Sequence, residues 1–344
     1  MNTTSGDLKR TFLMTLVVLA TALVVYALIK VINLVFLVFL ALLVSIFLSF
    51  FVNFFSEKLK TPRGVALALS LLLLLSIVVV LVMTLVPVVI SQGQRALEQL
   101  PALAVKLQEM INSFLSKIGS DTYVEVDELI RNAVSKGGAF LSRGIFTAVG
   151  KGVYGAMQAL ALIVIAIYFS LSKIDDPTPI ARFFPPAKRG RVSWVYVNII
   201  KKLRAWLMGQ LFSMTVIAFM YSVGLTIIGV PYSLFFGILA GALCFVPYIG
   251  PPTSTLGPLL FALAESPMKG VWVLVLYATS QTLESYFLTP LVMRHQVKLH
   301  PIVTIVSIMA MGQLFGILGV AVAVPTVAVG QFLFEEILVK SVAK

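Results

Sequence analysis

The residues of this sequence that are best suited to chemistry lie in the stretch "ATSQTLESYFLTP", residues 278–290. There Gln281, Glu284 and Ser285 recur at three- and four-residue spacing, which places them on one face of a helix. Such a face offers a carboxylate, an amide and a hydroxyl to a polar solute or a cation. We therefore treat these three residues as candidates for the lining of a solute pathway.

Glu284 is the most informative of the three because it lies within an apolar segment. A carboxylate at membrane depth is costly and usually faces a cavity or a partner. In the chain beyond residue 176, the other acidic residues stand at the ends of segments: Glu265, Glu335 and Glu336. Any carboxylate-based coupling to H+ or Na+ in this half of the chain must therefore use Glu284. The alternative is a structural role, through an ion pair with Arg294 or Lys298 or through hydrogen bonds that hold the helices together.

Two long apolar runs are interrupted by proline and glycine. Residues 234–263 contain "CFVPYIGPPTSTLGP" at 244–258, and residues 301–334 contain "GQLFGILG" at 312–319. Backbone groups freed by such breaks must face protein or water, because each unpaired group costs several kcal/mol in hydrocarbon. Helix ends at membrane depth also offer partial charges, amides and carbonyls to polar solutes. Residues of the two breaks that we expect in the pathway are Pro247, Tyr248, Gly250, Pro251 and Gln313.

Other kinds of chemistry find little support in the sequence. His295 and His300 are five residues apart, which is wrong for one helical face, and they lack companion ligands, so we expect no metal site. The sequence has neither a phosphate-binding glycine-lysine loop nor a Gly-x-Ser-x-Gly nucleophile motif. We therefore predict no enzyme activity and no cofactor. The single Cys244 cannot form an internal disulfide and is expected to be packed and inert.

The composition places these residues in a membrane protein. Hydrophobic residues make up 59% of the 344 residues and charged residues 12%, and the mean hydropathy is +1.02. This balance is far from that of soluble domains. The net charge of +12 gathers in segments expected to be cytoplasmic, above all residues 173–204. It follows the positive-inside rule rather than indicating nucleic acid. We expect a multi-pass protein of the cell membrane, surrounded by membrane lipids, with both termini cytoplasmic.

The predicted fold class is an all-α integral membrane protein, a polytopic helical bundle with about eight hydrophobic segments. The first domain, residues 1–90, holds three transmembrane helices and is a candidate scaffold. Its spans are expected at residues 11–29, 31–55 and 64–90, with the first two joined at residues 30–33.

The rest of the chain divides into four parts. Residues 91–151 are amphipathic and predict a small extramembrane helical hairpin, which is either a cap or gate or a packing surface. Residues 152–204 hold a fourth span at 152–171 and a basic interfacial helix. Residues 205–336 form the core with the two broken segments, and residues 337–344 form a cytoplasmic tail.

Two topologies remain open for the core. In the first, every apolar run crosses the membrane, which puts Arg294 and Lys298 outside, against the positive-inside rule. In the second, the two interrupted runs are re-entrant hairpins that enter from opposite faces, and the same two residues lie inside. The second agrees with the charges, and we prefer it. Candidates for a gate or an interface are Arg204, Gln210, Arg294 and His300.

Six segments carry a resemblance to a known family: "KLRAWLMGQ" (202–210), "GVPYSLFFGILAG" (229–241), "FVPYIGP" (245–251), "QTLESYFLTPLVM" (281–293), "VKLHP" (297–301) and "GILGVAVAVP" (316–325). In order and spacing they resemble the autoinducer-2 exporter family of bacterial and archaeal permeases. The resemblance places the family's Pro-Tyr-Ile-Gly-Pro turn at residues 247–251, its Gln and Glu at Gln281 and Glu284, and its His-Pro at residues 300–301. Arg294 departs from the pattern, since many members have glycine there.

The resemblance implies secondary transport without naming a cargo. Some members are described as exporters of autoinducer-2 and others as sodium or lithium/proton antiporters, and a homo-oligomer is expected. Our leading hypothesis is a permease that moves a small polar solute or signal by alternating access. One alternative is a monovalent cation/proton antiporter that uses Glu284, which the extra cation of Arg294 makes less attractive. Another is a nontransporting membrane scaffold that acts through the amphipathic hairpin.

Overall fold

The structure is a computed structural model, and it describes residues 5–117, 152–288 and 301–336. Every regular element in these ranges is helical, which confirms the all-α fold class. The elements are α1 (Ser5–Lys58), α2 (Arg63–Lys117), α4 (Gly152–Leu171), α5 (Thr178–Ala181), α6 (Pro186–Ile228), α7 (Ser233–Leu243), α8 (Gly250–Glu265), α9 (Pro267–Leu283), a π-helical turn (Glu284–Leu288) and α11 (Pro301–Phe334). Within the described residues, three segments are long and apolar enough to cross a membrane: Leu34–Lys58, Arg63–Met110 and Pro186–Ile228.

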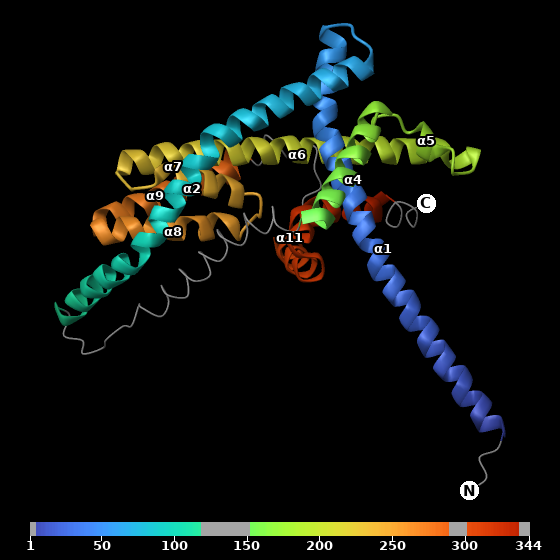
Figure 1. Ribbon diagram of the computed structural model, residues 1–344, viewed down its shortest axis with the longest axis horizontal. Coiled ribbons are helices and arrows are strands. Elements are labelled where there is room, and N and C mark those ends of the chain that lie inside the picture. The colour runs from blue at the N-terminus through green and yellow to red at the C-terminus, as the bar shows by residue number, and fades with distance from the viewer. Residues whose placement is uncertain (1–4, 118–151, 289–300, 337–344) are drawn as a thin grey trace.

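Helix α1 is continuous where two separate spans are expected. Its 54 residues run through residues 30–33 without a break, so the predicted joint there is wrong. The reason is local, because these four residues include neither proline nor glycine and nothing ends the helix. At 1.5 Å per residue the helix is about 81 Å long, far more than the roughly 30 Å of a hydrocarbon core. Figure 1 shows its amino-terminal half extending away from the other helices.

Helix α2 joins the third predicted span to the amphipathic region without interruption. It runs from Arg63 to Lys117 and contains Pro87 and Pro101. Its last part, residues 91–117, is called the α2 arm here. The arm crosses α7 and α8 in Figure 1, and its Leu107 packs against Ala264 of α8. The second half of the predicted amphipathic hairpin lies outside the described residues.

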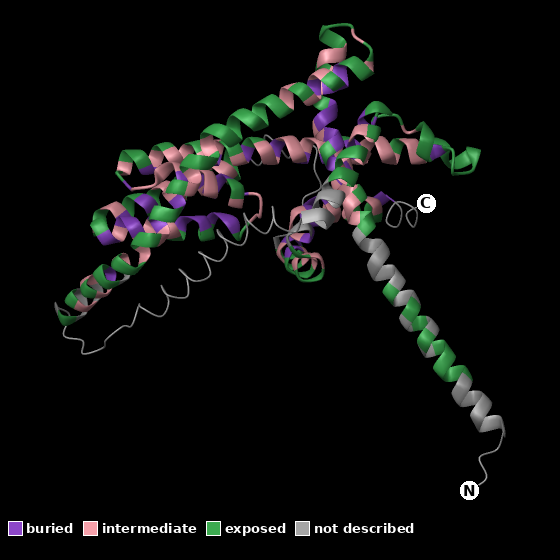
Figure 2. Ribbon diagram, viewed as in Figure 1, coloured by how far each residue is buried: buried purple, intermediate pink, exposed green. Residues whose placement is uncertain are grey.

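The helices pack as two lobes joined by α2 and α6 (Figure 1). The α1 lobe contains α1, α4, α5, α11 and the first half of α6, packed around residues such as Ile46, Leu203 and Val322. The hairpin lobe contains α7, α8, α9, the α2 arm and the second half of α6, packed around Tyr221 and Phe236. Between the lobes, most residues of α2 are exposed (Figure 2). The predicted fourth span agrees in its bounds with α4, whereas the predicted basic interfacial helix and fifth span form a single α6.

The end of α6 fixes where the following hairpin begins. Gly229 has φ +78, a left-handed conformation that favours glycine, and the Val230 amide donates to the Leu225 carbonyl at 2.9 Å. The ammonium of Lys269, at the start of α9, donates to the Gly229 carbonyl at 3.1 Å. The end of α6 and the start of α9 therefore lie together, so the chain between them leaves and returns to the same end of the lobe.

Helices α7 and α8 form a tight hairpin around the first predicted break. Only residues 244–249 lie between the two helices, and Tyr248 adopts φ +66 there. The predicted break at 244–258 is thus too long, because Pro251 and Pro252 fit the first turn of α8, where a missing N–H costs nothing. Gly250 closes the hairpin: a Cβ on it would lie 1.8 Å from the Leu243 carbonyl oxygen.

The second predicted break, residues 312–319, is present in α11. Gly316 has φ +63 and ψ −147, which interrupts the helix. A Cβ on Gly319 would lie 2.0 Å from the Met311 carbonyl oxygen, although eight residues of straight helix would separate them by about 12 Å. The helix therefore folds back on itself at Gly316. Phe315, beside this bend, packs on Phe36 of α1 with ring centroids 4.4 Å apart.

The α2 arm caps the amino terminus of α7. Tyr232, the residue before α7, provides no side-chain cap, and the Gln92 side-chain oxygen accepts a hydrogen bond from the Phe235 amide at 3.0 Å instead. Gly93 lies against the same residue, since a Cβ on it would be 2.9 Å from the Phe235 ring. A first-turn amide of α7 is thereby satisfied from a distant helix. The contact fixes the arm to the hairpin.

We expect Gln92→Ala to destabilise the protein by about 1 kcal/mol, because it removes both a helix cap and an interhelical hydrogen bond. Thermal unfolding of the purified protein in detergent measures the effect as a lower melting temperature. Gln99→Ala is the matched control, since Gln99 is exposed on the same arm. Equal melting temperatures for the two variants would show that the cap contributes nothing.

Candidate functional site

A polar cluster forms where the tip of the α7–α8 hairpin meets the carboxyl-terminal end of α9. The Cys244 thiol lies 3.5 Å from Glu284 Oε1, and the Gln281 amide donates to Glu284 Oε2 at 3.3 Å. From α6, the Gln210 amide donates to the Cys244 carbonyl at 3.0 Å. Three of the predicted site residues are thus brought together around Cys244.

The helix around Glu284 is irregular. Residues Glu284–Leu288 form a π-helical turn directly after α9, and such turns are frequent at functional sites. The Glu284 side chain is half-buried and bonded only to neutral groups, the Cys244 thiol and the Gln281 amide, among the described residues. Arg294 and Lys298, its predicted structural partners, lie outside the described residues, so that pairing stays a prediction.

The tip offers acceptors more readily than donors. Cys244 directly follows α7, where helix carbonyls carry partial negative charge, and the Glu284 carboxylate lies beside it. The opposite partial charge, at the start of α8, is blunted because Pro251 and Pro252 have no N–H. The cluster can therefore bind a cation or the hydroxyl and amine groups of a solute better than it can bind an anion.

A second polar group holds the hairpin to α6 and α9. The Tyr221 hydroxyl, almost fully buried, lies 2.9 Å from the Thr255 hydroxyl, and it also interacts with the buried Ser280 side chain. Thr255 and Ser254 each donate to the Pro251 carbonyl, at 2.9 and 2.8 Å. These hydroxyls are satisfied by one another and by the Pro251 carbonyl inside the hairpin lobe, as buried polar groups must be.

The other residues predicted for the pathway are more scattered. Tyr248 is 53% exposed at the tip and Pro247 is half-buried beside it, whereas Gly250 and Pro251 are buried in the packing of the hairpin. Ser285 is exposed, one residue beyond Glu284. Gln313 is also exposed, on α11, which packs against α1 and α6. Residues on both sides of the second break, Met311 and Val320, share a hydrophobic cluster with Phe245 and Val246 of the hairpin tip.

Of the four gate or interface candidates, two have described partners. Gln210 belongs to the cluster. Arg204 instead pairs with Asp175 in the loop after α4, at 2.8 and 2.9 Å from the two carboxylate oxygens. His300 and Arg294 lie outside the described residues. In the described part of the chain, no group of three or more His, Cys, Asp or Glu side chains is arranged to hold a metal ion.

Sequence reasoning missed several residues of this region. Cys244 is buried as expected, but its thiol and carbonyl are the centre of the cluster rather than inert packing. Tyr221, Thr255 and Ser280 were also not predicted. The sequence shows each of them only as a hydroxyl-bearing residue within an apolar helical run. That pattern is weak evidence for a contact between helices, because membrane helices often bond such hydroxyls to their own backbone.

Comparison with known proteins finds relatives along most of the chain. Residues 12–338 match the family described as "AI-2E family transporter". The chain is 25% identical to "Putative transport protein YrrI" of Bacillus subtilis over 305 residues, which cover 85% of this chain and 84% of the relative. It is 25% identical to "Putative permease PerM" of Escherichia coli K12 over 170 residues, 48% of each chain. The chain belongs to the AI-2E family of membrane transporters.

Proposed function

We propose that this protein is a secondary permease for a small polar solute, which passes the tip of the α7–α8 hairpin beside Glu284. The observation that carries the proposal is the contact of a half-buried carboxylate with an interrupted helix, at 3.5 Å from the Cys244 thiol. Interrupted helices that meet ionisable side chains near mid-membrane are typical of solute sites in secondary transporters. The relatives named as transport proteins and permeases support the same class of function.

The fold supports the topology with a re-entrant α7–α8 hairpin. If every apolar run crossed the membrane, the end of α6 and the start of α9 would stand on opposite faces. The hydrogen bond from Lys269 to Gly229 instead joins these two ends. Helices α7 and α8, with 11 and 16 residues, are also shorter than the roughly 20 residues that a span requires.

The solute class follows from the donors and acceptors at the tip. Gln210 and Gln281 donate to the Cys244 carbonyl and the Glu284 carboxylate in this structure. A solute that carries hydroxyl or amine groups can replace those amide donors one for one. An anion would find the carboxylate repulsive and the prolines without amides to bind it. We therefore expect a neutral or cationic, hydroxyl- or amine-bearing solute.

The two lobes provide a means of alternating access. Phe245 and Val246 at the hairpin tip pack with the α1 lobe, and Phe245 contacts Trp206 with ring centroids 6.2 Å apart. Helices α7 and α8 themselves pack in the hairpin lobe. The tip thus bridges the boundary between the lobes, and movement of one lobe against the other would open or close the path beside Glu284.

A second candidate function is monovalent cation/proton antiport. The observation that favours it is the acceptor-rich tip around Glu284, which suits a dehydrated cation as well as a hydroxylated solute. In that case the carboxylate would carry the proton in one direction and the cation in the other.

Uptake into proteoliposomes tests both functions. We expect gradient-driven flux of a hydroxylated or amine-bearing solute, or of Na+ or Li+ against H+, in vesicles with the protein and none in empty vesicles. Flux of neither class, with and without an imposed proton gradient, would contradict transport and favour a scaffold role. A homo-oligomer is expected, and its size can be measured on the same preparation by light scattering.

A further inference from the structure

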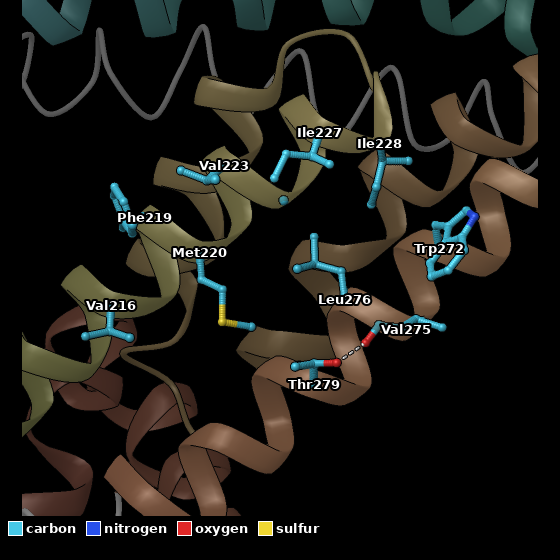
Figure 3. A pocket seen from close by; sticks show the side chains of 11 residues that line it. Val216, Phe219, Met220, Val223, Ile227, Ile228, Trp272, Val275, Leu276 and Thr279 are labelled. Atoms are coloured by element: carbon cyan, nitrogen blue, oxygen red, sulfur yellow. Dashed lines mark hydrogen bonds between the residues drawn. The ribbon is translucent and has the colours of Figure 1, made fainter.

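An open apolar groove runs between α6 and α9 on the surface of the hairpin lobe (Figure 3). Its volume is about 530 Å³. Val216 and Thr279 lie toward one end, and Ile228 and Trp272 lie toward the other. The groove is distinct from the Glu284 cluster, because none of its lining residues belongs to that cluster.

The chemistry of the groove excludes a polar occupant. Thr279 supplies the only hydroxyl, and that hydroxyl already donates to the Val275 carbonyl of its own helix at 2.8 Å. The rest of the lining is aliphatic or aromatic, with methionine sulfur. Apart from the Trp272 indole N–H at one end, the lining side chains offer no free partner to a polar solute, which would lose its hydration there. A hydrocarbon chain needs no such partner.

The length of the groove matches half a bilayer. The α6 wall runs from Val216 to Ile228, and twelve residues of helix rise about 18 Å, close to half of a hydrocarbon core of roughly 30 Å. The helices can approach closely at Gly224, where a Cβ would lie 2.6 Å from a methyl carbon of Leu276. This contact forms the floor of the groove.

One end of the groove carries residues typical of the membrane interface. Trp272 is 54% exposed there, and Lys269 lies one helical turn earlier with its ammonium bonded to Gly229 and paired with Glu265. Tryptophan and lysine are common at the level of lipid headgroups. Because Glu265 neutralises Lys269, this end offers no net charge to a headgroup.

We propose that the groove holds one acyl chain of a phospholipid, with the headgroup beside Trp272 and Lys269. Because the basic residues 173–204 are expected to be cytoplasmic, the end of α6 faces the outside, and the lipid is one of the outer leaflet. The volume lies within the roughly 300–1,000 Å³ of small-ligand sites. Chain contacts drive the binding, so zwitterionic and anionic phospholipids bind equally well.

The test uses a phospholipid with brominated acyl chains, which quenches nearby tryptophan fluorescence. The lipid is titrated into the purified protein in detergent, and the Trp272 signal is taken as the difference from a Trp272→Phe variant. We expect quenching that saturates at one lipid per chain, with the same midpoint for brominated phosphatidylcholine and phosphatidylglycerol and at low and high salt.

Two neighbouring residues on α9 give matched variants. Val275 lines the groove and Leu274 does not, although they are 44% and 49% exposed. We expect Val275→Phe to raise the midpoint at least tenfold and Leu274→Phe to leave it unchanged. Quenching that rises without saturation, or that responds equally to the two variants, would overturn the proposal. Cross-linking of Val275→Cys between protomers would also overturn it, in favour of a second copy as the occupant.

Discussion

Gly250→Ala is expected to abolish transport and to destabilise the protein by about 3 kcal/mol or more. The added Cβ would lie 1.8 Å from the Leu243 carbonyl oxygen, which is backbone and cannot rotate away as a side chain can. Gly250 is helical and has no positive φ, so the effect comes from this contact alone. The hairpin would have to open, and the Cys244 contact with Glu284 would be lost with it.

The measurement for Gly250→Ala is thermal unfolding in detergent together with flux in proteoliposomes. Gly330→Ala is the matched control, because Gly330 also lies within a helix but a Cβ there meets nothing within 4 Å. Alanine is the better helix former, so the control should be as stable as the unsubstituted protein or slightly more stable. A normal melting temperature and normal flux for Gly250→Ala would show that the close approach of the two helices does not matter.

Glu284→Gln has the second largest expected effect, a fall in flux of roughly 10- to 100-fold. The substitution keeps the shape and one acceptor but removes the charge, and a hydrogen bond to a charged group contributes about 1.5–3 kcal/mol, or one to two powers of ten. Any dependence of flux on pH that arises from the Glu284 carboxylate should disappear as well. Flux measured across a pH series in proteoliposomes tests both expectations.

Two controls distinguish a role of Glu284 in the solute path from a structural role in helix packing. Glu265→Gln removes an acid at the exposed end of α8, where it pairs with Lys269, and it should retain flux. The melting temperature of Glu284→Gln should remain close to that of the unsubstituted protein. A large drop in melting temperature together with lost flux would instead identify Glu284 as a structural hydrogen-bonding residue, the alternative that its sequence position left open.

Much of the fold followed from local sequence chemistry. Proline and glycine located both bends, at residues 244–249 and at Gly316, because these residues disrupt helices irrespective of their surroundings. The exact extent of the first bend did not follow, since Pro251 and Pro252 are compatible with a helix start. The joint predicted at residues 30–33 was wrong because apolar length alone does not tell one long helix from two spans.

The sequence predicted only the part of the site that lies along one helix. Spacing placed Gln281 and Glu284 together on α9 and its π-helical turn, but the third element was a tertiary contact: Cys244 reaches Glu284 across 40 positions of sequence. The Gln92 cap on Phe235 spans 143 positions and likewise could not be predicted from the periodicity of the sequence. Such contacts depend on how helices are packed, which spacing along one helix does not encode.

Entry and exit of the α7–α8 segment on one face of the membrane are central to the proposed transport path. Ser233→Cys and Met268→Cys place thiols at the first residue of α7 and at the second residue of α9, just beyond the end of α8. The native Cys244 is buried, and the unsubstituted protein reports its background. A membrane-impermeant maleimide applied to sealed, right-side-out vesicles should label both introduced cysteines. Labelling of one from outside and of the other only after the vesicles are opened would show that this segment crosses the membrane, and would contradict a re-entrant hairpin.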